Sequence, residues 1–440
     1  MFNLFENQEF QRRRREFLRD ISFLAGSTAL LSAAPWAQAL SAENFSEIKK
    51  NGRARLAVIG VGSRGRALLL NLQAVAHAEI TAVCDSYQPH LDRAHGLTQG
   101  KADSYLDYRE ILGRKDIDGV VIATPLHQHK HITIDALNAG MHVFCEKSMA
   151  RTLEDCREMV IAQKATGRIL QIGHQRLFNP IYLHAMDKIR KGELGEVHQM
   201  RAFWHRNGDW RRSLPNNDAS FEKRFNWRLY KESSAGLMTE LASHQIQVAN
   251  WLFDEVPAQV MGSGSICFWK DGREVYDHVA LIYEYSKGRK LIYDSLISNK
   301  KYGLEEQVMG HLGTMELEVN RQYSENPATS KNVKQLAAEI ERGECKPIPI
   351  GGATWQPETG TQEVGTPILT GEYEDTLLQM EAFAAAVLKN EAYPGVLREG
   401  YHASIGALLG EKAMDTGKPV KWHERYIMPK EAEIATLSLT

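Results

Sequence analysis

The sequence is poor in cysteine, and the cysteines that it has form no paired pattern. Its 440 residues include five cysteines, at positions 84, 145, 156, 267 and 345, and no two of them form a C-x-x-C pair. An odd number without a spacing pattern favours neither a disulfide framework nor a zinc site, so we expect no metal. Cys84 and Cys145 lie in apolar runs and are predicted to be buried small side chains.

Net charge and long apolar runs are also nearly absent. The formal net charge is −2, which argues against nucleic acid as an electrostatic partner. Beyond the N-terminal segment no run is long enough to cross a bilayer, so no membrane contact is expected once that segment is removed. The content of 43% hydrophobic and 25% charged residues is ordinary for a globular protein, and the length suffices for two domains.

The first residues have the composition of a targeting signal. A basic block at residues 12–15 precedes a mostly apolar stretch at 21–34, and Ala37-Gln38-Ala39 matches a small-x-small cleavage site. Residues 14–18 resemble a bacterial twin-arginine export signal. We therefore predict a signal segment at 1–39 and a periplasmic protein. The alternative is an amphipathic start to a cytoplasmic protein.

A glycine-rich turn follows the first apolar run of the remaining chain. Residues 55–59 lead directly into Gly60-Val61-Gly62-Ser63-Arg64-Gly65, a G-x-G-x-x-G between a predicted strand and a predicted helix. Gly60 permits a tight turn, Gly62 lets the backbone approach a pyrophosphate, and Gly65 lets the helix pack on the strand. About 20 residues further on, a second apolar run ends in Asp85, where a ribose ligand is expected. The alternative is a glycine-rich turn without a ligand.

Two patterns of secondary structure divide the chain. Residues 53–175 alternate strand-like and helix-like segments, which indicates a doubly wound parallel sheet of the Rossmann type. In residues 176–425 strand-like runs follow one another, which indicates an α+β domain with an open, mainly antiparallel sheet. The predicted strands lie at 78–84, 119–124, 142–145, 169–172, 199–205, 259–269, 279–285 and 290–298. Helices are predicted at 153–165, 237–252, 374–388 and 401–414, and a long loop at 350–371.

Two short segments carry candidate catalytic residues. Glu146 and Lys147 follow a predicted strand of the parallel sheet, at the end where ligands bind in such sheets. A lysine there can hydrogen-bond a substrate hydroxyl, although a surface lysine is the simpler interpretation. Glu240 and His244 lie four residues apart on a predicted helix and share a face. A histidine beside a carboxylate is an acid or base tunable near neutral pH, and a structural contact is the alternative.

A polar and aromatic cluster precedes that helix. Tryptophan faces with arginine and asparagine donors suit a sugar site, and they also suit a protein interface or a surface loop with buried anchors. The cluster consists of Trp204, His205, Arg206, Asn207, Asp209, Trp210, Arg211 and Arg212, followed by Phe225, Asn226, Trp227, Arg228 and Tyr230. Among these, Arg206, Trp210, Trp227, Arg228 and Tyr230 are the predicted substrate contacts.

Together these segments resemble the glucose–fructose oxidoreductase and inositol dehydrogenase family, Gfo/Idh/MocA, over roughly residues 53–425. The resemblance implies that Lys147 lies between nicotinamide and substrate, that His244 is the general acid/base, and that Glu240 stands where the family usually has Asp. It also implies a cofactor site made of Gly60, Gly62, Ser63, Arg64, Gly65, Asp85, Thr124, Pro125, His129, Glu146, Lys147 and Gln175.

The chain departs from the family pattern at several of these positions. Ser148 follows Lys147 where the family has Pro, Gln247 stands where many members have Asp, and Leu126 replaces a common Asn. These changes put the usual polyol substrates in doubt. Among the alternating histidines 127, 129 and 131, only His129 matches a family position. Residues two apart on a helix point about 200° apart, so the three are not expected to form one metal site.

We therefore predict an oxidoreductase that acts on a secondary hydroxyl of a sugar or glycoside with a tightly held, internally recycled cofactor. Asp85, followed by Ser86 and Tyr87 rather than Arg, favours NAD, while Arg64 keeps NADP as an alternative. The first alternative function is an NAD-dependent glycoside hydrolase that oxidises its substrate transiently. The second is a catalytically silent sugar-binding protein. A homo-oligomer, dimer or tetramer, is expected.

Overall fold

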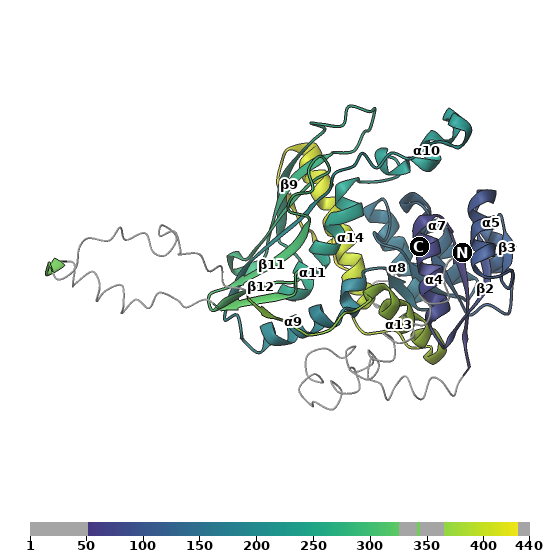
Figure 1. The fold of residues 1–440 in the computed structure, drawn as a ribbon, viewed down its shortest axis with the longest axis horizontal. Helices are drawn as coiled ribbons and strands as arrows, with labels where there is room; N and C mark the ends of the chain where they lie inside the picture. The colour runs from purple at the N-terminus through teal and green to yellow at the C-terminus, as the bar shows by residue number, and fades with distance from the viewer. Residues whose placement is uncertain (1–51, 325–340, 344–364, 430–440) are drawn as a thin grey trace.

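A computed structural model describes residues 52–324, 341–343 and 365–429 of the chain. It contains two β-sheets, each flanked by helices, that lie side by side (Figure 1). The predicted export signal at residues 1–39 lies outside the described residues. So does most of the predicted loop at 350–371, whose described end contains the short strand β14 (Thr366–Pro367).

The first sheet is parallel and has six strands in the order β3-β2-β1-β4-β5-β6. Its strands are β1 (Ala54–Ile59), β2 (Ala78–Cys84), β3 (Asp103–Tyr105), β4 (Gly119–Ile122), β5 (His142–Cys145) and β6 (Leu170–Ile172). The strand order reverses between β1 and β4, which is where ligands bind in doubly wound sheets. The predicted Rossmann-type sheet is confirmed; β3 is a short, polar edge strand that the apolar pattern did not indicate.

Helices cover both faces of this sheet. They are α4 (Ser63–Ala74), α5 (Gln88–Leu97), α6 (Tyr108–Leu112), α7 (His129–Asn138) and α8 (Leu153–Thr166). Local chemistry sets several of their ends. The side chains of Asp107 and Thr152 accept backbone N–H bonds as N-caps of α6 and α8, and Gly167 ends α8 in the left-handed region at φ 64°.

The second sheet has nine strands in the order β14-β13-β12-β11-β7-β10-β9-β8-β15. Only the β7–β10 pairing is parallel among those described, so the prediction of an open, mainly antiparallel sheet is confirmed. The strands besides β14 are β7 (Val197–His205), β8 (Gln259–Ser265), β9 (His278–Glu284), β10 (Lys290–Leu296), β11 (Leu304–Gly310), β12 (Gly313–Glu316), β13 (Arg321–Ser324) and β15 (Val420–Lys421).

Two segments join the sheets. The first is η3 (Gln175–Phe178) with α9 (Pro180–Arg190), which leads from β6 to β7. The second contains α13 (Asp375–Lys389) and α14 (Val396–Thr416) near the C-terminus. α13 packs on α4 and β1 of the parallel sheet, and α14 contacts both β6 and β8. Helices from the end of the chain therefore complete the core of the first sheet, although their sequence position places them with the second.

The predicted helix at 237–252 consists of two parts. Residues Met238–Ala242 form a π-helical turn, η7, and α11 continues from Ser243 to Phe253. α11 packs against α14 and lies between the two sheets (Figure 1). It is buried along almost its whole length, although five of its eleven residues are polar: Ser243, His244, Gln245, Gln247 and Asn250. This helix brings His244 toward the carboxyl ends of the parallel strands.

Candidate active site

The turn after β1 has the close packing that a dinucleotide cradle requires. A Cβ atom at Gly65 would lie 1.9 Å from the carbonyl oxygen of Gly60, and a Cβ at Gly60 would lie 2.7 Å from the Thr124 nitrogen. At Gly62 a Cβ would meet no atom closer than 3.9 Å, so this glycine borders open space at the N-terminus of α4. The close packing at Gly60 and Gly65 and the space at Gly62 fit a turn that binds a pyrophosphate.

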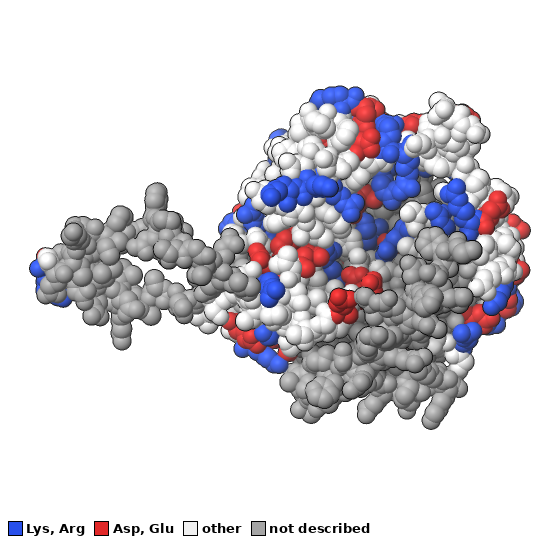
Figure 2. All heavy atoms as spheres, viewed as in Figure 1, with Lys and Arg blue, Asp and Glu red and all other residues white. Residues whose placement is uncertain are grey.

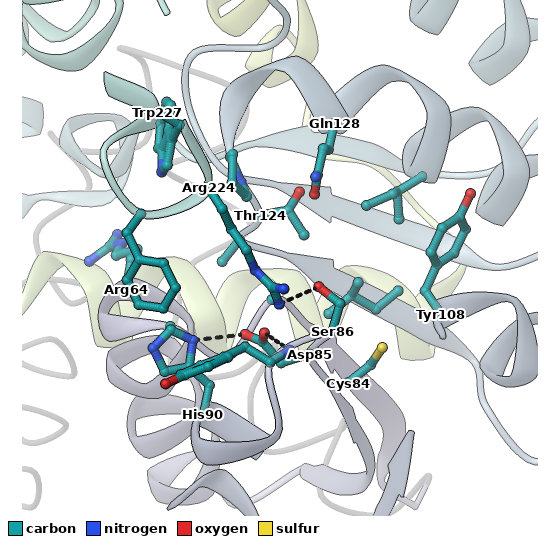
Figure 3. A pocket seen from close by; sticks show the side chains of 18 of the residues that line it. Arg64, Cys84, Asp85, Ser86, His90, Tyr108, Thr124, Gln128, Arg224 and Trp227 are labelled. Carbon is teal, nitrogen blue, oxygen red and sulfur yellow. Dashed lines mark hydrogen bonds and ion pairs between the residues drawn. The ribbon is translucent and has the colours of Figure 1, made fainter. Parts of the chain in front are cut away.

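Asp85 lies at the end of β2, on the edge of a cavity of about 560 Å³ (Figure 3). Its carboxylate accepts a hydrogen bond of 2.9 Å from the Tyr87 backbone N–H and lies 3.3 Å from Nδ1 of His90. Thr124 and Pro125, after β4, line the same cavity. The cavity therefore spans the point where the strand order reverses. Its size and its acidic residue fit the adenosine and ribose of NAD.

Glu146 and Lys147 follow β5 and line a second cavity of about 380 Å³. The Glu146 carboxylate accepts a hydrogen bond of 2.7 Å from Nε of Arg64, which lines both cavities. The Nζ atom of Lys147 donates to the carbonyl oxygens of Thr239 (3.3 Å) and Glu240 (2.8 Å) in η7. In a π-helical turn the usual i→i+4 pattern is interrupted, which leaves carbonyl groups for such contacts. Lys147 thus ties the two domains together at the cavity.

Glu240 does not pair with His244, contrary to the sequence prediction. Its carboxylate accepts a hydrogen bond of 2.6 Å from Nε of Arg228, and no bond to His244 is found in the described part of the chain. Burial would raise the pKa of Glu240, but the charges of Arg228 and Lys147 outweigh it and lower the pKa. The helical spacing correctly placed Glu240 and His244 on one cavity. It did not identify the partner because Arg228 comes from a different segment.

His244 lies at the start of α11 with 4% of its surface exposed. Its ring centroid is 5.6 Å from that of Trp204 and 5.8 Å from that of His174, and its Nδ1 atom is buried without a hydrogen-bond partner. Burial lowers the pKa of His244 well below its ordinary value, and the nearby charges of Arg176 and Lys147 lower it further. The imidazole is therefore neutral at physiological pH and can accept a proton.

Two further predicted cofactor residues lie at the wall of the second cavity. His129 is buried, and its two ring nitrogens each lie 3.0 Å from a carbonyl oxygen, one of Thr124 and one of Ser148. It therefore joins the loops that follow β4 and β5. Gln175 has a buried side-chain oxygen without a hydrogen-bond partner. Gln175 therefore lies at the cavity wall with its side-chain oxygen covered by neighbouring residues.

Four of the five predicted substrate residues line the second cavity: Arg206, Trp210, Trp227 and Arg228. The Arg206 guanidinium lies 5.1 Å from the ring centre of Trp204, and that of Arg228 lies 4.2 Å from that of Trp227. On this face Lys and Arg side chains gather around the hollow between the domains (Figure 2). Aromatic faces and donors therefore surround the space in front of Lys147 and His244, as a sugar site needs.

Tyr230, the fifth predicted substrate residue, is placed elsewhere. It does not line either of these cavities, and its hydroxyl donates a hydrogen bond of 2.7 Å to Glu222. Tyr230 is therefore not a substrate contact in this structure; it holds its own segment in place. Conversely, Arg224 and Phe225 line the first cavity although neither was assigned to the cofactor. They lie more than 100 residues from the β2 segment that they meet, so no local signal identifies them.

The described part of the chain holds no group of three or more His, Cys, Asp or Glu residues arranged to bind a metal ion. Cys84, Cys145, Cys156 and Cys267 have free thiols. Among the described helices, none has the length and apolar character needed to cross a membrane.

Comparison with protein families gives two matches. Residues 54–174 match the model described as "Oxidoreductase family, NAD-binding Rossmann fold", and residues 182–316 match the "GFO/IDH/MocA C-terminal domain". The first match covers the dinucleotide cradle and Lys147. The second covers the segment that carries Glu240 and His244.

Individual relatives are more distant. The chain is 27% identical to an inositol 2-dehydrogenase/D-chiro-inositol 3-dehydrogenase of Shouchella clausii over 271 residues, 60% of this chain and 71% of that protein. It is 31% identical to a glycosyl hydrolase family 109 protein of a Shewanella species over 177 residues, 36% of this chain and 39% of that protein. The latter match therefore spans about two fifths of that relative.

Solved structures share the fold at low identity. A levoglucosan dehydrogenase in complex with NADH and levoglucosan matches with a TM-score of 0.64 at 19% identity, over 86% of this chain and 100% of that one. An aldose-aldose oxidoreductase from Caulobacter crescentus matches with a TM-score of 0.64 at 21% identity, over 84% of this chain and 100% of that one.

Proposed function

The chain belongs to the Gfo/Idh/MocA family of oxidoreductases, and we propose that it oxidises a secondary hydroxyl group of a sugar or glycoside with an NAD that stays bound. One observation carries this proposal. Lys147 from the NAD-binding domain and His244 from the second domain line a single cavity, together with Trp204, Arg206 and Trp227. Arg64 borders both this cavity and the dinucleotide cavity, so the two spaces adjoin.

His244 is the proton acceptor in this proposal. It is neutral and lines the cavity, so its imidazole can take the proton of a substrate hydroxyl. The cations Arg176 and Lys147 oppose a positive charge on the ring. The accepted proton therefore leaves His244 readily, which suits a group that returns the proton when the reaction reverses. When bound, NAD supplies the acceptor for the hydride of the carbinol carbon.

Lys147 orients the hydroxyl group. A protonated lysine has three donors, and the carbonyl oxygens of Thr239 and Glu240 accept two of them. The third donor is left for the substrate oxygen. Burial lowers the pKa of Lys147, while the negative charges of Glu240 and Glu146 oppose that shift. The two carboxylates therefore help to keep the ammonium charged.

A glycoside hydrolase that works by transient oxidation is the second candidate. It is favoured by the similarity to glycosyl hydrolase family 109 proteins. It also agrees with the pairing of the two carboxylates in the cavity, because Glu146 is ion-paired with Arg64 and Glu240 with Arg228. A direct hydrolysis would need a protonated carboxyl group to act as general acid, whereas the pKa of Glu240 is lowered. His244 and Lys147 would serve a redox-assisted cleavage equally well.

We expect the cofactor to stay bound because of where the protein is proposed to act. We propose that the segment at 1–39 directs export by the twin-arginine route, so that the folded protein works in the periplasm with the NAD it carries. Such an enzyme must return its cofactor to the starting state in each cycle, either by reducing a second sugar or by returning the hydride to the same substrate. NADP is the alternative cofactor, and a homo-oligomer is proposed for the active form.

The experiment that tests the proposal has two steps. Mass spectrometry identifies the dinucleotide released from the purified protein, and a panel of sugars and glycosides is then screened for ketone products and for cleavage. We expect bound NAD and at least one substrate class that yields one of these products. A protein that binds no dinucleotide and converts no sugar would contradict the proposal and favour a silent sugar-binding protein.

A further inference from the structure

A short segment of the second domain crosses over the NAD-binding domain. It consists of η5 (Ala219–Phe221), α10 (Glu222–Phe225) and η6 (Trp227–Leu229), and we name residues 219–229 the clasp. In Figure 1, α10 projects from the second domain and overhangs the region of α5 and α7. The clasp lines the dinucleotide cavity with Arg224, Phe225 and Trp227.

Aromatic contacts seat the clasp on the end of β2. The ring of Tyr87 meets the edge of Phe225 at a centroid distance of 5.1 Å and the edge of Phe221 at 6.0 Å. His90, which lies beside Asp85, is 6.0 Å from Phe225. Edge-to-face pairs at these distances are favourable beyond the area that they bury. Two domains therefore meet at the rim of the cavity that fits the adenosine.

Arg224 extends this contact into the cavity. Its guanidinium donates a hydrogen bond of 3.0 Å to Oγ of Ser86 and lies 5.4 Å from the ring centre of Tyr87. Figure 3 shows this side chain extending toward Asp85 and Ser86. A planar guanidinium in this position can stack on a purine base, as arginine does on aromatic faces.

The clasp is held in shape by its own domain. The carboxylate of Glu222 accepts hydrogen bonds from the Tyr230 hydroxyl (2.7 Å), from Nδ2 of Asn226 (2.9 Å) and from Arg211. Asn226 in turn accepts a hydrogen bond of 2.6 Å from the backbone N–H of Arg212. The segment is thus built before a ligand arrives, and the ordering cost on binding is small.

We propose that the clasp retains the dinucleotide, with Arg224 and Phe225 closing over its adenosine half, so that NAD leaves only when the clasp lifts from Tyr87. The inference deepens the proposed function, because a cofactor recycled in place must dissociate slowly. It assigns a binding role to a segment outside the NAD-binding domain. The ligand class is an adenine dinucleotide, recognised through its base and ribose.

The test measures cofactor release rather than turnover. Arg224→Ala, Phe225→Ala and the wild-type protein are loaded with NADH, and its fluorescence is followed while excess NAD displaces it. We expect release to be about tenfold faster in both variants, since each loses a side chain on which the base can stack. The dinucleotide content after gel filtration should fall correspondingly.

Lys223→Ala is the matched control. Lys223 lies on the same α10 but is exposed and pairs with Glu232 at 2.8 Å, away from the cavity lining. Its variant should release NADH at the wild-type rate. If the Arg224 variant releases NADH at the wild-type rate, the proposal is overturned. It is also overturned if the variant loses affinity for NADP alone, because Arg224 would then contact the 2′-phosphate rather than the adenosine. Because release needs no sugar, a failed substrate screen leaves this result intact and counts only against the proposed reaction.

Discussion

Replacing Glu240 with Gln tests whether its carboxylate changes the pKa of Lys147 or that of His244. The helical spacing suggests that Glu240 tunes His244, whereas its contacts join it to Arg228 and place its backbone carbonyl 2.8 Å from Nζ of Lys147. Among the charges that raise the pKa of Lys147, that of Glu240 is the largest. Its removal also leaves the Arg228 cation without its partner, and this cation lowers the same pKa.

Both effects act in one direction. A nearby carboxylate stabilises the charged form of a lysine, and the buried site screens this interaction little. The charge that Glu240 shares with Arg228 limits the effect but does not change its direction. Lys147 must be protonated to have a donor left for the substrate. The alkaline limb of kcat/KM should therefore move to lower pH in the variant.

The assay is the pH profile of kcat/KM for oxidation of a confirmed substrate, with Glu240→Asp as the charge-retaining control. We expect the control to keep the wild-type alkaline limb. The acid limb, set by His244, should stay far below pH 6.5 in all three proteins, because burial and two neighbouring cations lower that pKa. If the Gln variant shifts the acid limb and leaves the alkaline limb in place, Glu240 acts on His244 and the reasoning is refuted.

The remaining predictions concern single residues of the two cavities. His244→Ala should leave NADH binding unchanged and lower turnover by roughly 10²–10⁴-fold, and near-native turnover would disprove its role. Gly65→Ala should lower the free energy of unfolding by about 1–3 kcal/mol, because its Cβ would lie 1.9 Å from the Gly60 carbonyl oxygen, as thermal denaturation will show. Gly62→Ala, with no atom closer than 3.9 Å to the new Cβ, should keep wild-type stability yet weaken NADH binding. Equal denaturation temperatures for the Gly62 and Gly65 variants would contradict this. Asp85→Ala should weaken NADH binding by roughly 10–100-fold and NADPH binding less, measured by fluorescence titration, whereas equal losses would argue against a ribose contact.

Local chemistry made much of the NAD-binding domain predictable. The packing at Gly60 and Gly65 and the space at Gly62 follow from backbone geometry, which is encoded within six neighbouring residues. Asp85 and Lys147 are identified because each follows a buried apolar strand, and parallel strands bring their carboxyl ends to one edge. Signals of this kind need no knowledge of distant contacts.

Long-range pairing set the limit of prediction. Strand β11 contains the buried pair Glu305 and Glu306, which interrupts the apolar pattern of a strand. Tyr182 and Arg176, from more than 100 residues earlier, meet Glu306 at 2.6 Å and 3.1 Å, and burial still raises its pKa to about 7. The partner of Glu240 was missed although Arg228 lies only twelve residues away, because the two are in different helical segments and meet through tertiary structure. The clasp likewise depends on rings far apart in sequence.

An enzyme that carries its NAD through complete cycles needs no added cofactor, and counting its turnovers without added NAD tests this most directly. Purified protein is dialysed, given its confirmed sugar substrate and followed for product and for nicotinamide absorbance. We expect many turnovers per active site while the absorbance shows only a small, steady offset. Product formation that stops at about one equivalent per site, and resumes only when NAD is supplied, would contradict the account and indicate an ordinary dehydrogenase with an exchangeable cofactor.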